Sequence, residues 1–344
     1  MKLPLPSLFA WGALLLLAGS GCVHSPQVRQ TGESVILIGE EPAHLAALPI
    51  GPLEVRSTFR PGSNTVIYIE GVDYWVNPTQ GTLGRTSQSR MPDFRTNVLY
   101  GATNFNHSKY PGFGNTAFFA FVDYAHAPGA PWPVQPNQTA HLPRTQARLN
   151  QGGPLKVVAF GDSITAGGDA TSPDLIFWKR WADHLQQTYP KAQITAINGA
   201  TGGDSTVQGL QRLEEKVLRE KPDLVLIGFG MNDHNRGGVP VPQFAENLKL
   251  MIQRIRASTP AEIVLFSAFP PNPEWTYGSH HMEDYAAATA QVATETGCAY
   301  ADVFTNWQAF SVRKKPEDLL GNNINHPNDF GHDLYYRVFL SLGL

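Results

Sequence analysis

The chain has 344 residues, of which 42% are hydrophobic and 16% charged, and its formal net charge is −3. This composition supplies enough apolar side chains for buried cores and excludes a disordered or fibrous protein. The 26 Lys and Arg residues form no cluster that could neutralise a run of phosphates, so we expect no nucleic-acid partner. At roughly 150 residues per domain, the length predicts about two domains.

Residues 1–22 have the features of an export signal. Lys2 precedes an apolar run from Leu8 to Ala18, which is shorter than the roughly 20 residues that a membrane-spanning helix needs. Small residues and then Cys22 follow, and the segment resembles a bacterial lipoprotein signal in which that cysteine is acylated. The resemblance implies a periplasmic or cell-surface lipoprotein that meets the membrane through this anchor. Ordinary secretion is the alternative.

Residues 33–125 are predicted to form a small β-sandwich accessory domain. Apolar residues occur there in short runs or with period two, as at 35–38 and 66–69, and turn residues separate them. The next stretch, residues 126–154, contains six prolines. Proline lacks a backbone N–H, so we expect this stretch to be a linker without regular structure.

From residue 155 onward, strand and helix patterns alternate. Continuous apolar runs predict five strands, and apolar residues at helical spacing predict four helices between them. Such alternation predicts a parallel sheet covered by helices on both faces, with the functional site at the carboxyl ends of its strands. The expected strands are 155–160, 194–197, 224–229, 263–268 and 300–303, and the expected helices 172–185, 210–217, 244–255 and 285–296.

Chemically useful residues follow several of these strands. Ser163 comes directly after the first strand, and Gly203 lies in a glycine-rich loop after the second. Asn232 follows the third strand, and His326 lies in a polar loop before a final helix. Each residue alone has a structural explanation, as a turn, a loop residue or a helix cap. Their common order and placement at strand ends favour one joint function.

Together these blocks resemble the SGNH (GDSL-type) hydrolase family over residues 155–344. Ser163 matches the nucleophile of that family, Gly203 and Asn232 its second- and third-block residues, and His326 its base. The resemblance implies a three-layer α/β/α flavodoxin-like domain that hydrolyses esters through an acyl-enzyme, without a cofactor or a metal. His326 would activate the serine hydroxyl. The backbone N–H groups of Ser163 and Gly203 and the amide of Asn232 would form the oxyanion hole.

One position departs from the family pattern. The family has an aspartate three residues before its histidine, and this chain has Asn323 there. One hypothesis is that the side-chain oxygen of Asn323 orients His326 as the third catalytic residue. The alternatives are that Asp318, Asp329 or a backbone carbonyl does so, or that the protein is a weakened homologue.

The resemblance also indicates a class of substrate. Exported SGNH enzymes with a β-sandwich domain resemble carbohydrate esterases. The resemblance therefore implies that the substrate is an acylated polysaccharide, from which this chain removes acetyl groups, or a small ester. A lipase- or thioesterase-type acyl hydrolase and a catalytically weak carbohydrate-binding surface protein are the alternatives. Trp275 and Tyr277 follow the fourth strand and are candidates for lining the cleft. His332, at the start of the final helix, is expected to be a surface cap.

Overall fold

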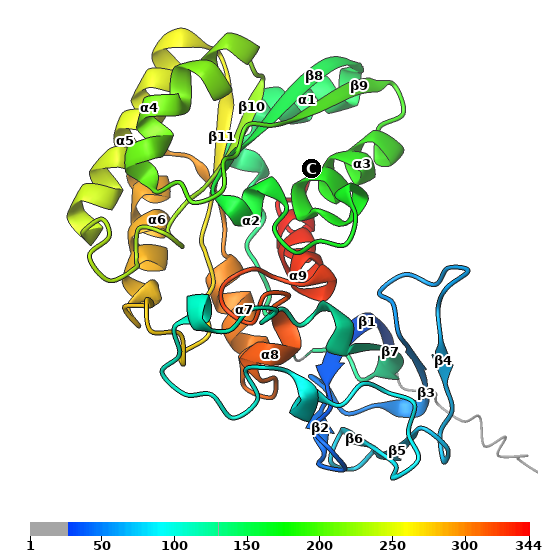
Figure 1. Ribbon diagram of the computed structural model, residues 1–344. Coiled ribbons are helices and arrows are strands. Elements are labelled where there is room, and N and C mark those ends of the chain that lie inside the picture. The colour runs from blue at the N-terminus through cyan, green and yellow to red at the C-terminus, as the bar shows by residue number, and fades with distance from the viewer. Residues whose placement is uncertain (1–26, 130) are drawn as a thin grey trace, which may run out of the picture.

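The computed structural model describes residues 27–129 and 131–344 (Figure 1). The predicted signal peptide, including Cys22, lies outside these described residues. No helix within the described ranges is long and apolar enough to cross a membrane. We refer to residues 27–129 as the β-rich region and to residues 131–344 as the α/β region.

Five parallel strands form the centre of the α/β region, in the spatial order β12-β11-β10-β8-β9. Numbered along the chain, this order is 2-1-3-4-5, which is the flavodoxin-like arrangement, so the predicted fold class is confirmed. The direction of the strand order reverses between β8 and β10, and such a reversal is where α/β sheets bind ligands. The strands are β8 (Gly153–Gly161), β9 (Ala192–Asn198), β10 (Leu224–Gly228), β11 (Glu262–Phe266) and β12 (Ala299–Ala301).

Helices cover both faces of this sheet. Helices α4, α5 and α6 lie on one face, and α3 and α9 lie on the other (Figure 1). Phe177 of α3 packs against Phe266 of β11 and Phe339 of α9, with ring centroids 5.4 and 5.3 Å away, so this layer has an aromatic core. The four helices predicted between the strands and the predicted final helix are present, while α2, α7 and α8 were not predicted. The helices are α2 (Ser163–Ala166), α3 (Phe177–Thr188), α4 (Thr206–Lys216), α5 (Val241–Ser258), α6 (Met282–Thr296), α7 (Val303–Ser311), α8 (Pro316–Leu319) and α9 (Asp329–Leu340).

The β-rich region contains two antiparallel sheets, with strand orders β1-β7-β3-β4 and β2-β6-β5. Val35 and Val122 of the first sheet and Leu83 of the second belong to one buried apolar cluster, so the two sheets share a core. Strand β1 begins at Val28, five residues before the predicted start of the accessory domain at residue 33. The strands are β1 (Val28–Ile36), β2 (Ala43–His44), β3 (Ile50–Arg56), β4 (Ile67–Tyr68), β5 (Tyr74–Asn77), β6 (Thr82–Arg85) and β7 (Phe119–His126).

The expectation of an irregular linker over residues 126–154 is wrong in its second half. Helix α1 (Pro143–Gln151) forms there, and β8 begins at Gly153. Pro143 is the first residue of α1, where a missing N–H costs no hydrogen bond. The carboxylate of Glu262 in β11 accepts from the N–H groups of Arg144 and Thr145 at 2.9 and 2.7 Å, which ties the helix to the sheet.

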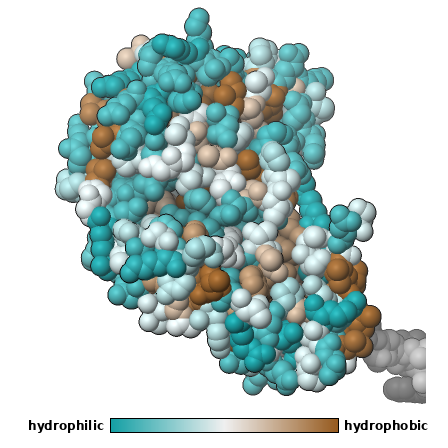
Figure 2. Space-filling model, in the orientation of Figure 1, coloured by the Kyte–Doolittle hydropathy of each residue, from teal (hydrophilic) through white to brown (hydrophobic). Residues whose placement is uncertain are grey.

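The two regions share a continuous core. Phe59, Phe119 and Phe121 of the β-rich region belong to the same buried cluster as the sheet and helices of the α/β region. The guanidinium of Arg180 in α3 also lies 5.7 Å from the ring centroid of Phe59. Most of the face seen in Figure 2 is hydrophilic, and apolar residues gather at the outer edge of the β-rich region. Among the residues of that region, Ile67 of β4 is exposed.

Candidate active site

Ser163 is the first residue of α2 and directly follows the buried strand β8. The side chain of Asp162 accepts from the N–H of Ile164 at 3.0 Å and so caps the short helix. Complete burial raises the pKa of Asp162 to about 7, which favours its neutral form. The hydroxyl of Ser163 is therefore presented at the carboxyl edge of the sheet, on a turn that its neighbour holds in place.

The imidazole of His326 connects Ser163 to a carboxylate. Its Nε2 lies 2.8 Å from Oγ of Ser163, and its Nδ1 lies 2.9 Å from Oδ2 of Asp169. In the neutral tautomer that fits both contacts, Nδ1–H donates to Asp169 and Nε2 accepts from the serine hydroxyl. The structure thus joins a hydroxyl, an imidazole and a carboxylate in the order that nucleophilic catalysis requires.

The hypothesis that Asn323 orients His326 is contradicted by this geometry. Asn323 is buried, and its side-chain oxygen has no hydrogen-bond partner among the described residues. The alternatives named from the sequence are also occupied elsewhere. Asp318 accepts from the N–H groups of Ile36 and Lys315. The family pattern predicts the acid three residues before the histidine, whereas in this chain Asp169 lies close to the serine. The sequence analysis therefore missed it.

Two glycines make room for the contact between Asp169 and His326. A Cβ on Gly168 would lie 2.8 Å from Nδ1 of His326, and a Cβ on Gly321 would lie 2.5 Å from Cβ of Asp169. Asp169 itself has a φ of 59°, in the left-handed region that aspartate tolerates better than most residues. The short segment Gly167-Gly168-Asp169 is the signal that could have indicated this acid from the sequence.

Helix α9 holds the loop that carries Asp169. Nε2 of His332 lies 3.1 Å from the carbonyl oxygen of Gly168 and donates to it. The carboxylate of Asp329 accepts from the N–H of Thr171 at 2.8 Å and from its hydroxyl at 2.7 Å. His332 is fully buried, so its expected role as a surface cap is wrong, and burial lowers its pKa to about 4. His332 is therefore a neutral donor that fixes the backbone beside Asp169.

The loop that contains the predicted oxyanion residue Gly203 passes close to Ser163. A Cβ on Gly202 would lie 3.8 Å from Cβ of Ser163, so the loop after β9 runs beside the nucleophile. The side-chain amide of Asn232 donates to the carbonyl oxygen of Asp204 at 2.9 Å, which uses one of its two hydrogens. The second hydrogen of that amide and the exposed backbone of Gly203 are available to a ligand. This arrangement fits the proposed oxyanion hole.

Aromatic residues after β11 contribute unequally to the surface. Trp275 is buried against Leu99, Phe105 and Ile324, so it supports its loop and does not face solvent. Tyr277 is exposed, and its hydroxyl accepts from the side-chain amide of Asn106 at 3.2 Å. Only the second of the two predicted cleft residues is therefore placed to meet a ligand.

Two further features bear on what the molecule could bind. Within residues 27–129 and 131–344, no three His, Cys, Asp or Glu side chains are grouped so that they could hold a metal ion. A cavity of about 670 Å³ opens beside α7, with Pro270, Trp307 and Val312 among its lining residues. Ser163 and His326 are not in its lining, so we locate the reaction at the hydrogen-bonded residues and not in this cavity.

The family profile described as "GDSL-like Lipase/Acylhydrolase family" matches residues 159–334, which is more than half of the chain. Ser163, Asp169, Asn232 and His326 all lie inside the match. The chain belongs to this family. As a GDSL hydrolase it is a carboxylic ester hydrolase, in agreement with the serine and histidine that the structure brings together.

Several relatives of this GDSL hydrolase carry esterase names. An arylesterase of Vibrio mimicus is 33% identical over 174 residues, which are 50% of this chain and 80% of the relative. The esterase TesA of Pseudomonas aeruginosa is 32% identical over 151 residues, 43% of this chain and 70% of that protein. An acetylxylan esterase of Geobacillus stearothermophilus is 24% identical over 165 residues, 45% and 75% of the two chains.

Solved structures share the fold. A two-domain esterase described as active on acetylated mannans and co-crystallised with mannopentaose aligns with a TM-score of 0.50 and 23% identity. The alignment covers 59% of this chain and 54% of that esterase, so this chain spans about half of the length of that structure.

We expect Asp169→Asn to lower kcat roughly 10³- to 10⁴-fold, because an amide cannot stabilise the imidazolium that forms during attack. Asn323→Asp should leave kcat near the wild-type value, since that side chain does not reach the imidazole. Steady-state kinetics with a p-nitrophenyl ester measure both effects. A large gain in Asn323→Asp, or little loss in Asp169→Asn, would contradict the assignment of the acid.

His332 should make the stability of the protein depend on pH. Its pKa is about 4 when folded, against a usual value of 6.5, so the unfolded chain binds more protons between these pH values. The stability that the protein gains from keeping His332 neutral is therefore present above about pH 6.5 and is lost as the pH falls toward 4. We expect His332→Gln, which can still donate to Gly168, to remove about 2 kcal/mol of the stability change between pH 7 and pH 4.5. Urea unfolding at both pH values measures this difference, and equal pH dependence in the two proteins would contradict it.

Proposed function

We propose that this GDSL hydrolase is a serine esterase that forms an acyl-enzyme on Ser163 and removes acetyl groups from carbohydrates. The contact of His326 with both Ser163 and Asp169 supports this proposal most directly. A hydroxyl is a weak nucleophile near neutral pH, and a base within hydrogen-bond distance is the usual way to activate it. The weakened-homologue alternative loses its main argument, because a carboxylate does contact the imidazole.

The mechanism follows from the positions of these groups. Oγ of Ser163 attacks the ester carbonyl carbon while Nε2 of His326 takes the hydroxyl proton. Asp169 stabilises the imidazolium through Nδ1–H, and His326 then returns the proton to the departing alkoxide. Water, activated by the same imidazole, attacks the acyl-enzyme in the second half of the reaction and releases the acid. Proton transfer of this kind contributes about 10² to 10⁴ in rate.

Negative charge forms on the carbonyl oxygen during both attacks. The N–H groups of Ser163 and Gly203 and the free amide hydrogen of Asn232 are the proposed donors to that oxygen. The contact of Asn232 with the carbonyl of Asp204 fixes the direction of its amide before substrate arrives. Donors that are oriented in advance need no reorganisation as the charge develops, which is why such groups stabilise the transition state strongly.

The choice of an acetylated carbohydrate has two supports. The acetylxylan esterase among the relatives favours it, and the exposed Tyr277 offers an aromatic face to a sugar ring. The relatives named arylesterase and TesA support the alternative of a broader acyl hydrolase. We also propose that the protein is exported and anchored through Cys22, or else secreted. That part of the proposal follows from the sequence of residues 1–22 alone.

We expect Asn232→Ala to fold normally and to lose about 10² to 10³ in kcat, as is typical when one oxyanion donor is removed. Because the side chain is partly exposed, its loss should affect stability little. Steady-state kinetics and a thermal melt of the same preparation separate the two effects. Near-normal turnover in this variant would refute the oxyanion role.

The function as a whole is tested by labelling and by substrate preference. A fluorophosphonate probe should label the wild-type protein at Ser163 and should not label Ser163→Ala. Release of acetate from acetylated xylan and mannan oligosaccharides should exceed release of longer acids from p-nitrophenyl esters of rising chain length. Preference for long acyl chains would favour the lipase or thioesterase alternative. Absence of labelling in a folded protein would support the carbohydrate-binding alternative.

A further inference from the structure

We propose that the β-rich region positions the catalytic histidine and is not merely an accessory to the α/β region. This inference rests on the esterase function proposed above. It assigns Ser34 and Asn115 as residues that position His326. The part of the chain concerned is the histidine segment, which we define as residues 313–328 and which includes α8 and His326.

Strand β1 holds the beginning of the histidine segment through its backbone and one side chain. The N–H of Ile36 donates to the carboxylate of Asp318 at 2.7 Å. The hydroxyl of Ser34 donates to the carbonyl oxygen of Asp318 and accepts from the side-chain amide of Asn328 at 3.0 Å. Ser34, Asp318 and Asn328 are all buried, so water cannot readily replace these hydrogen bonds. Ser34 therefore connects both ends of the turn that carries His326.

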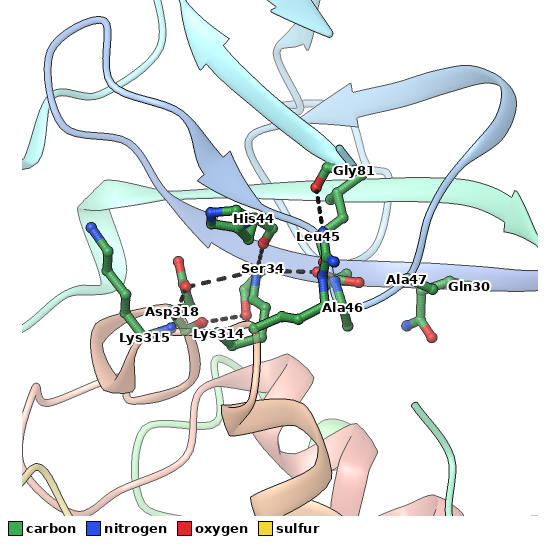
Figure 3. Close-up of polar contacts among 12 residues, drawn as sticks. Gln30, Ser34, His44, Leu45, Ala46, Ala47, Gly81, Lys314, Lys315 and Asp318 are labelled. Carbon is green, nitrogen blue, oxygen red and sulfur yellow. Dashed lines mark hydrogen bonds and ion pairs between the residues drawn. The ribbon is translucent and has the colours of Figure 1, made fainter. Parts of the chain in front are cut away.

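A buried ion pair strengthens the same junction. Nζ of Lys314 lies 3.1 Å from the carboxylate of Glu33, and both side chains are fully buried. Lys314 also donates to the carbonyl oxygen of His44 at 2.9 Å, and Glu33 accepts from the hydroxyl of Tyr124 at 2.6 Å (Figure 3 shows part of this network). A buried charge is tolerated only where it is paired and hydrogen-bonded, so the network specifies how β1 sits against the segment.

Asn115 holds the segment from a second side. It lies in the stretch between β6 and β7, four residues before β7, and it is fully buried. Its N–H donates to the carbonyl oxygen of Gly321 at 2.7 Å. Its side-chain amide donates to the carbonyl oxygens of Leu320 at 3.0 Å and Glu317 at 3.3 Å. A single residue of the β-rich region thus satisfies three carbonyl groups, one within α8 and two in the turn that follows it.

These anchors are directly connected to the imidazole. The N–H of Gly321 donates to the carbonyl oxygen of His326 at 2.9 Å, and the N–H of His326 donates to the side chain of Asn322 at 2.9 Å. Leu320 and Pro327 form a backbone bridge on either side of this turn. Gly321 also faces Cβ of Asp169. A shift of Leu320 or Gly321 would therefore move His326 relative to both of its catalytic partners.

The experiment compares three variants of the full chain. Ser34→Ala removes the hydroxyl between Asp318 and Asn328, and Asn115→Ala removes the two side-chain donors to the segment. Asp73→Asn is the matched control, because Asp73 is a buried residue of the β-rich region that pairs with Arg90 and makes no hydrogen bond or ion pair with residues 313–328. Thermal melts and circular dichroism first establish that each variant is folded at the assay temperature.

The expected result is a loss in kcat without a matching change in KM. Misplacement of a catalytic group by a fraction of an ångström lowers the rate of the chemical step, and we expect about a 10-fold loss for Ser34→Ala or Asn115→Ala. The rate of labelling of Ser163 by the fluorophosphonate should fall in parallel. Asp73→Asn should match the wild type in kcat, in KM and in labelling rate.

A readout that needs no turnover separates this inference from the esterase proposal. The proton between Nδ1 of His326 and Asp169 should give a downfield ¹H NMR signal that weakens or broadens in Ser34→Ala and Asn115→Ala. An inactive wild-type protein with this NMR difference would refute the esterase function and support the positioning role. Folded variants with wild-type kcat, labelling rate and NMR signal would overturn the positioning role. If Ser34→Ala fails to fold, Asn115→Ala decides the same question through different contacts.

Discussion

The contact between His326 and Asp169 is the interaction on which the rest of the site depends. It draws the acid from the same short turn as the nucleophile, since Ser163 and Asp169 are separated by one helical turn and two glycines. In the pattern with an aspartate three residues before the histidine, acid and base would move together and the serine would be the distant partner. Here the serine and the acid share one turn, and the imidazole is the group that must be brought from far along the chain.

Two separate parts of the site must therefore be held in position, the turn with Ser163 and Asp169 and the loop with His326. The turn that carries Ser163 and Asp169 is held by β8, by the cap from Asp162 and by His332 of α9. All three supports belong to the α/β region. His326 lies in a loop without regular structure, and a loop gains a fixed position only through contacts with something rigid. Strand β1 and Asn115 provide those contacts, in addition to the apolar core that the two regions share.

Much of this molecule could be predicted from its sequence, for identifiable reasons. Strands β10 and β11 are buried along their whole length and appear as continuous apolar runs, so their positions and the alternation of strands with helices followed from periodicity. The flavodoxin-like arrangement followed from the family resemblance. Ser163, Asn232 and His326 lie at strand ends or loops whose motifs are local. Helix α1 was missed because Pro143 was read as a breaker, although a first-turn proline is compatible with a helix.

The acid was missed for a different reason, which is that its role depends on long-range geometry. Asp169 acquires its function only when the turn around His326 folds back onto Gly168 and Gly321. The segment Gly167-Gly168-Asp169 places an acid near the nucleophile, but it does not show that His326 contacts that acid. The buried state of His332 was equally inaccessible, because the sequence places it on a helix but does not show that Phe177 stacks against its ring. Contacts across more than a hundred residues are where local reasoning from a single sequence ends.

The environment of Asn323 explains why that position does not carry the acid. Its backbone has a φ of 63°, and its backbone carbonyl oxygen accepts from the side-chain amide of Asn272 at 2.9 Å. Its side chain is buried. A carboxylate there would be removed from water without a cation or a donor to compensate for its lost hydration, which is costly. An amide is neutral and incurs a smaller cost. Asp169 is partly exposed, so water and the imidazole can both stabilise its charge, and this is the more favourable place for the carboxylate that the histidine requires.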